Sequence, residues 1–112
     1  MQNIDFTYNW NKKLDCDCFT TFRIYNPAKY KIGDTVTVSL KGQIIKECVI
    51  IDVKKMKIAQ VNTFIANLDT GYSVDEFKKI VHTMYKKTPN IESIDFALIL
   101  LKTTRTQETF FP

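Results

Sequence analysis

Two threonines and an arginine lie close together in a segment whose residue types could carry chemistry. Thr20, Thr21 and Arg23 fall within residues 16–34, which read CDCFTTFRIYNPAKYKIGD. Neighbouring hydroxyls with a guanidinium two residues on form a compact set of donors, suited to a base edge, a phosphate or a carboxylate. Alternation along a strand would place Thr21, Arg23 and Tyr25 on one face and Thr20 on the other. The segment therefore predicts a binding site.

Aromatic and basic residues elsewhere in the chain could extend this site. Trp10, Tyr25 and Tyr72 offer ring faces on which a nucleobase can stack. Lysines that could add salt-sensitive attraction to phosphates stand at positions 31, 54, 55 and 57, as Lys31, Lys54, Lys55 and Lys57. Each feature also has a purely structural interpretation, in which the single tryptophan fills the core and the lysines form a solvated surface. In the same interpretation, Arg23 pairs with Asp34 or Glu76.

The cysteines do not indicate a disulfide framework or a metal site. The chain has three cysteines, Cys16, Cys18 and Cys48, and a single histidine. An odd number of cysteines favours reduced thiols, and a C-x-C pair with one distant cysteine is not a recognisable zinc-ligand set. We therefore predict no metal and no cofactor.

Composition and charge limit the class of protein. The 112 residues are 45% hydrophobic and 25% charged, which suits one domain with a real core. The net charge is +4, and residues 20–57 hold eight Lys and Arg against three Asp and Glu. Such a basic block permits an anionic partner such as nucleic acid. No apolar run is long enough to span a membrane, and the start of the chain does not resemble a signal peptide, so we expect a cytoplasmic protein.

Hydrophobic periodicity predicts strands and two main helices. Strands are expected at 3–8, 20–25, 34–41, 43–53 and 94–101, and successive apolar residues at 48–51 predict that this part of its strand is covered on both faces. Helical spacing predicts one helix over 58–68, stopped by Gly71, and another over 74–87, started by a capping box at Ser73 and Glu76. We expect a single domain over 1–102 and a tail over 103–112.

The order of these elements and several short motifs resemble the ASCH family of the PUA-like superfold. The family signature has the form Gly-Lys-Lys-Thr-x-Thr-x-Arg, and residues 16–23, CDCFTTFR, occupy its position here. A tyrosine with Gly-Asp follows at Tyr30 and 33–34. Gly-Tyr-Ser then stands at 71–73, before a helix that contains Glu-Phe at 76–77. The resemblance covers about residues 3–101.

This resemblance implies a fold and two kinds of activity. The implied fold class is α+β, a small, mostly antiparallel PUA-like β-barrel with two main helices at its rim and a cleft beside the signature. Relatives are linked to RNA binding, and one branch consists of amidohydrolases that act on acylated cytidine nucleosides. The catalytic set of that branch is a signature lysine, a threonine and an acidic residue before the second helix. Here Thr21 matches the threonine and Cys18 stands in place of the lysine. Thr70 falls near the acidic position, with Asp69 one residue earlier.

Three functional hypotheses follow from these observations. The first is a nucleic-acid- or nucleotide-binding domain, directed at RNA, that uses the cleft beside Thr20 and Arg23. The second is an amidohydrolase with Cys18 or Thr21 as nucleophile and Asp69 as base, although a tunable lysine amine is missing from the signature. The third is a viral or mobile-element interaction module that captures a protein partner or a second copy of itself through Phe110 and Phe111.

Overall fold

The computed structural model describes residues 1–106, and its five strands form one curled sheet in the order β1-β3-β4-β5-β2. β1 pairs with β3 in parallel, and all other neighbours are antiparallel. The predicted α+β class is confirmed, in the form of a half-barrel sheet with helices. In chain order the strands are β1 (Gln2–Phe6), β2 (Cys18–Ile24), β3 (Thr35–Leu40), β4 (Gln43–Met56) and β5 (Phe96–Thr106).

The β3–β4 hairpin turns at the Lys41-Gly42 pair, between the strands predicted at 34–41 and 43–53. Both residues have positive φ, 52° and 83°, which matches the twist of the strands that they join. One prediction for β4 is wrong, because Ile51 is exposed rather than covered on both faces. The register between β4 and β5 shifts between Ile50 and Asp52, so Ile51 lies at a bulge that interrupts the regular alternation.

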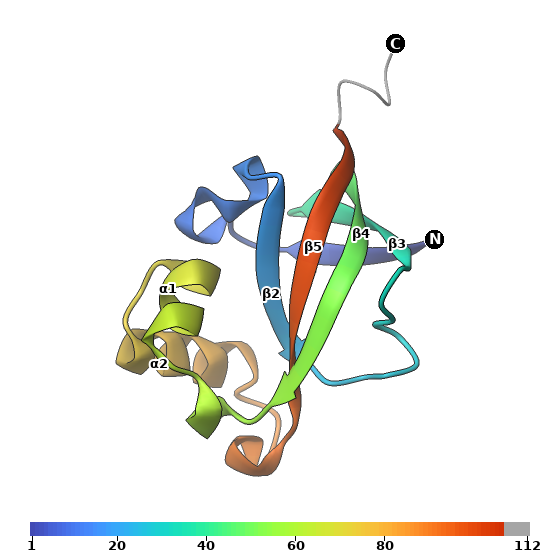
Figure 1. Cartoon of the computed structure of the whole chain (residues 1–112). Helices are drawn as coiled ribbons and strands as arrows, with labels where there is room; N and C mark the ends of the chain where they lie inside the picture. Colours follow the sequence, from blue (N-terminus) through green and yellow to red (C-terminus); the bar gives the residue numbers. More distant parts are fainter. Residues whose placement is uncertain (107–112) are drawn as a thin grey trace.

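The helices lie beside β2, on one side of the sheet (Figure 1). Two α-helices, α1 (Thr63–Thr70) and α2 (Val74–Met84), accompany the 3-10 helices η1 (Trp10–Asp15), η2 (Ile58–Gln60) and η3 (Ile91–Ser93). The prediction of a single helix over 58–68 is wrong, because η2 and α1 are separate helices. The break occurs because Asn62 caps a new helix, its side chain accepting a hydrogen bond from the Ile65 amide at 2.9 Å.

Two apolar clusters form the core. One lies within the curl of the sheet and includes Ile4, Val38 and Leu101. The other joins the sheet to the helices, where the Phe22 ring stacks on Phe96 at 4.7 Å and meets Phe77 edge-on at 5.2 Å, measured between ring centroids. β2 contributes side chains to both clusters, so one of its faces packs inside the curl of the sheet and the other packs against the helices.

The edges of the half-barrel, β1 and β2, are joined by side chains. The Arg23 guanidinium on β2 donates through Nη2 to the Asp5 carbonyl on β1 at 2.7 Å. The Phe6 and Phe19 rings pack edge-to-face across the same line, with centroids 6.2 Å apart. We call this line the β1–β2 seam. It passes directly beside the Thr-Thr-x-Arg segment.

The last strand is longer than predicted. β5 continues to Thr106 and pairs with the start of β4, where Thr106 lies opposite Lys46. The first four residues of the expected tail, 103–106, therefore belong to the sheet. Phe110 and Phe111, the predicted anchor, lie outside the described residues. Within residues 1–106, no helix combines the length and apolar character needed to cross a membrane.

Candidate functional site

The backbone of η1 positions the side chain of Lys13 inside the protein. Asn11 and Lys12 both have positive φ, 56° and 53°, which breaks the 3-10 helix and redirects the chain before Lys13. The Asn11 amide donates to the Asn67 carbonyl of α1 at 3.2 Å. Asn11 also lies against Gly71, where an added Cβ would meet its side chain at 3.0 Å. These contacts dock η1 on the end of α1 and bury Lys13.

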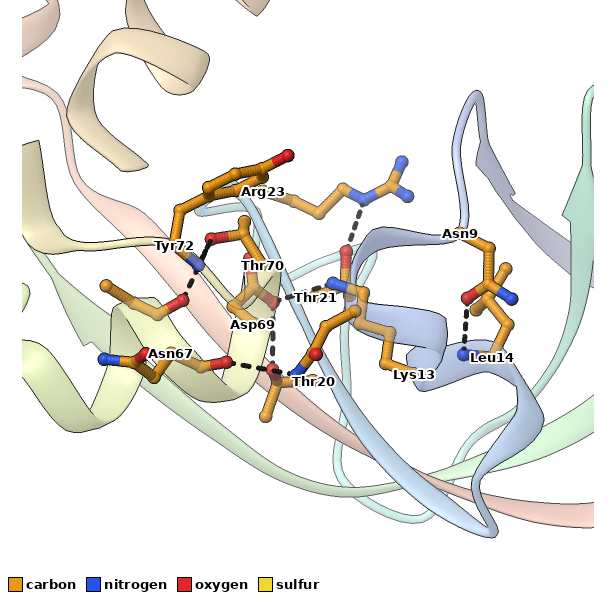
Figure 2. A network of polar contacts seen from close by, with 12 residues as sticks. Asn9, Lys13, Leu14, Thr20, Thr21, Arg23, Asn67, Asp69, Thr70 and Tyr72 are labelled. Carbon is orange, nitrogen blue, oxygen red and sulfur yellow. Dashed lines mark hydrogen bonds and ion pairs between the residues drawn. The ribbon is translucent and has the colours of Figure 1, made fainter. Parts of the chain in front are cut away.

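Lys13 forms a buried ion pair with Asp69. Their Nζ and Oδ1 atoms are 2.9 Å apart, and the two side chains are only 6% and 7% exposed. The Thr20 hydroxyl donates to the same Oδ1 at 2.9 Å. Figure 2 shows Lys13 and Thr20 reaching this carboxylate from two elements far from Asp69 in the sequence. The Lys13–Asp69–Thr20 network thus connects η1, β2 and α1.

Thr21 and Arg23 form a second polar unit, on the face of β2 opposite to that of Thr20. Arg23 Nε donates to Thr21 Oγ1 at 3.0 Å, and the guanidinium carbon lies 4.9 Å from the centroid of the Phe6 ring. With its bond to the Asp5 carbonyl, the guanidinium is held by two hydrogen bonds and one ring. Because Thr21 Oγ1 accepts from Arg23, its own proton remains available for another acceptor.

A cavity of about 210 Å³ lies where these two units meet. Thr21, Arg23, Lys13 and Asp69 supply polar groups to its wall. Much of the remaining wall is aromatic or aliphatic and comes from β1, η1, β2 and α2, with Phe6, Trp10, Phe22, Phe77, Ile80, Val81, Met84 and Tyr85. We call this the central cavity. Its apolar wall with a few convergent polar groups is typical of a small-molecule site.

Burial changes the ionisation of groups in this wall. It lowers the pKa of Lys13, and the charge and hydrogen bond of Asp69 offset part of that decrease. Burial likewise raises the pKa of Tyr85, against the opposing influence of the Arg23 charge. The Lys13 ammonium is therefore more easily deprotonated than that of a solvated lysine.

The structure brings four of the predicted site residues together and separates others. Trp10, Thr21, Arg23 and Asp69 all line the central cavity. Cys18 does not line it; this exposed residue lies on the opposite face of β2, in an outer hollow of about 220 Å³. That hollow also includes Cys16 and Thr20, and Lys13 borders both spaces.

The remaining predicted residues lie around the central cavity rather than in its wall. Tyr72 packs edge-on against Trp10 at 6.0 Å between ring centroids. Lys55 Nζ lies 5.2 Å from the centroid of the Tyr25 ring, and Tyr25 belongs to an adjacent hollow. Lys31 is exposed in the loop after β2, and Lys54 borders another hollow on the outer face of the sheet.

Lys13 is a polar residue of the central cavity that sequence reasoning missed. Its only signal is the pair Lys12-Lys13 after Trp10, which would ordinarily indicate solvated side chains. The helix α2 also contributes an unexpected wall, through Ile80, Val81 and Met84. Across residues 1–106, no three His, Cys, Asp or Glu side chains gather in a way that could hold a metal ion.

Comparisons with known proteins identify a similar fold. No protein-family model matches the sequence, and no curated protein matches it significantly. Among solved structures, the fold is similar to the crystal structure of a protein from Enterococcus faecalis V583 assigned to the family DUF984. The TM-score is 0.60 with 11% sequence identity, and the match covers 86% of this chain and 69% of that chain. At this identity the likeness concerns the fold alone.

Proposed function

We propose that the protein binds a nucleoside or nucleotide unit in the central cavity. The observation that carries the proposal is the convergence of Lys13, Thr21, Arg23 and Asp69 on one small space with a largely apolar wall. A volume of about 210 Å³ suits one heterocycle better than a drug-sized molecule, whose pockets begin near about 300 Å³. Hydroxyl, guanidinium and ammonium donors can bond base edges, and Trp10 can contact a ring.

The cavity favours a single unit over an extended RNA strand. Of the predicted phosphate-binding lysines, Lys31, Lys54 and Lys55 do not line it, and Lys57 is paired with Asp95 at 2.7 Å. The resemblance to the ASCH family supports the same ligand chemistry, because its members are linked to RNA and to cytidine nucleosides. RNA binding would use this cavity for one nucleotide of the strand.

Calorimetric titration tests the proposal. The four common ribonucleosides, their 5′-monophosphates and a single-stranded RNA oligonucleotide are the probes. Met84→Trp fills the mouth of the cavity from an exposed position on α2 and should abolish binding. Lys79→Trp is the matched control, because Lys79 is exposed on the same helix and does not line the cavity. Absence of binding by every probe, or full binding by Met84→Trp, would contradict the proposal.

A second candidate function, amide hydrolysis, is favoured by the position of Lys13. The resemblance implies a lysine, a threonine and an acidic residue as the catalytic set, and the central cavity is lined by Lys13, Thr21 and Asp69. The lysine comes from η1 instead of the signature. In this proposal neutral Lys13 accepts the Thr21 proton as the hydroxyl attacks the amide carbonyl, the amine leaves with a proton, and water hydrolyses the resulting ester.

Release of acetate from N4-acetylcytidine tests this second candidate. Thr21→Val keeps the shape of the side chain and removes the nucleophile, so it should abolish release. Cys18→Ser is the matched control, because Cys18 lies in the outer hollow and should be dispensable. Turnover that survives Thr21→Val, or is lost in Cys18→Ser, would contradict the assignment.

A further inference from the structure

A second, more polar hollow adjoins the central cavity. Its volume is about 280 Å³, and it lies between the end of β2, the loop that follows and the end of α2. Arg23 and Tyr85 line both spaces, so the two hollows meet at these side chains. The other side chains of the second hollow come from Ile24, Tyr25, Asn26, Lys29 and Tyr30.

The charges that line this second hollow are all positive. Arg23 and Lys29 belong to its wall, and among residues 1–106 no acidic side chain does. Tyrosine hydroxyls and the Asn26 amide add neutral donors. By contrast, the central cavity contains the Lys13–Asp69 pair, whose charges compensate each other. The excess positive charge therefore lies in the second hollow, next to the central cavity on the far side of Arg23 and Tyr85.

Arg23 has donors to spare for an anion. A guanidinium carries five N–H groups, and the structure uses one on Thr21 and one on the Asp5 carbonyl. Within residues 1–106, neither Arg23 nor Lys29 forms an ion pair with a carboxylate. The Asp5 carboxylate accepts hydrogen bonds from the Ser39 hydroxyl and the Gly42 amide, and the Arg23 charge has only a minor effect on its pKa.

The local fold holds this hollow in shape. The Asn26 side chain accepts from the Ala28 amide at 3.2 Å, and the Lys29 and Tyr30 amides both donate to the Asn26 carbonyl. This turn buries the Tyr30 ring and places the Lys29 ammonium 5.5 Å from its centroid. Lys29 is thus directed along an aromatic surface next to the space that Arg23 borders.

We infer that this hollow is an anion subsite for a phosphate monoester, and that the ligand of the central cavity is a nucleotide rather than a nucleoside. This inference rests on the proposed function, because the phosphate is assigned to a ligand whose base lies in the central cavity. Arg23 and Lys29 bind the phosphate oxygens, and the hydroxyls of Tyr25 and Tyr85 can supply neutral hydrogen bonds. Charge-assisted hydrogen bonds of this kind are the strong ones in proteins.

Calorimetry with paired ligands tests the subsite. For the wild-type protein, a nucleoside 5′-monophosphate should bind about tenfold or more tightly than its nucleoside, as expected for one charge-assisted hydrogen bond. The preference should decrease with added salt. Lys29→Gln should reduce it severalfold. Lys31→Gln is the matched control, since Lys31 is also exposed, lies two residues on and does not line the hollow.

The outcomes separate this inference from the proposed function. If nucleosides and their monophosphates bind equally well, or if Lys31→Gln reduces the preference as much as Lys29→Gln, the subsite is refuted while base binding stands. If ribose 5-phosphate binds in a Lys29-dependent manner and as tightly as the nucleoside monophosphates, and no nucleoside binds, the subsite stands and the proposed function fails. Absence of binding by monophosphates and ribose 5-phosphate alike overturns the subsite.

Discussion

Removing the Lys13 charge should destabilise the protein strongly, because it leaves a buried carboxylate without a cation. In Lys13→Met, the Asp69 carboxylate, whose side chain is 7% exposed, keeps the Thr20 hydroxyl as its one hydrogen-bond donor among residues 1–106. Breaking one partner of a buried ion pair costs about 3–5 kcal/mol. This is a large part of the free energy of unfolding of a small domain, about 5–15 kcal/mol.

Urea denaturation, followed by circular dichroism, measures this loss. With an m value of about 1.5 kcal/mol/M, the unfolding midpoint of Lys13→Met should fall by about 2–3 M. The double variant Lys13→Met, Asp69→Leu removes both charges and fills the space with apolar atoms. Its free energy of unfolding should lie within about 2 kcal/mol of the wild type, since hydrophobic replacements of buried pairs are often neutral.

Two results would refute this reasoning. One is a loss of less than about 1 kcal/mol in Lys13→Met, which would mean that water or another cation compensates Asp69. The other is a double variant whose loss equals the sum of the two single losses, which would mean that the charges do not interact. If Lys13→Met does not fold, Asp69→Asn alone tests the ion pair in its place, because it removes the charge of Asp69 while the amide oxygen can still accept from Thr20.

Three further predictions concern other parts of the fold. Gly71→Ala should cost about 1–3 kcal/mol in chemical denaturation, because φ is +80° and the new Cβ meets Asn11 at 3.0 Å; Asn11→Ala should recover only the steric part. Burial raises the pKa of the Cys48 thiol from 9.0 to about 11, so stability should decrease as the pH rises through this interval, and Cys48→Ala should lack that decrease. The hydrogen bond from the Ser39 hydroxyl and, to a smaller extent, the one from the Gly42 amide lower the pKa of Asp5 from its ordinary value of 3.8. Stability from this carboxylate is present above pH 3.8 and lost as the pH falls through the lowered value; an acid titration of Asp5→Asn that still shows this component would contradict the assignment.

Much of the scaffold could be predicted from local patterns. Alternation of apolar residues located the strands, and the gap between the strands predicted at 34–41 and 43–53 left Gly42 for the hairpin turn, because both features depend on neighbours in sequence. Gly71 and Ser73 marked the boundary between α1 and α2 for the same reason: one has positive φ, and the other accepts a hydrogen bond from the Glu76 amide. These are rules of the backbone and of helix ends.

The missed features depend on distant partners. Lys13 is buried because η1 docks on α1, more than fifty residues later in the chain, and its sequence neighbours give no sign of this. Ile51 is exposed because β4 and β5 differ in register at that point. Residues 103–106 look like a polar tail but form a strand, because pairing with β4 satisfies backbone groups whatever the side chains are.

At the β1–β2 seam, the distance between the two edge strands is not fixed by backbone hydrogen bonds. A ladder of amides would hold two strands at a spacing of about 4.8 Å. Here side chains join the two strands instead, through the Arg23 hydrogen bond to the Asp5 carbonyl and the contact between the Phe6 and Phe19 rings. A shorter or longer donor at position 23 would change the size of the central cavity while every strand kept its register. Position 23 is therefore the residue to vary in a redesign of ligand size.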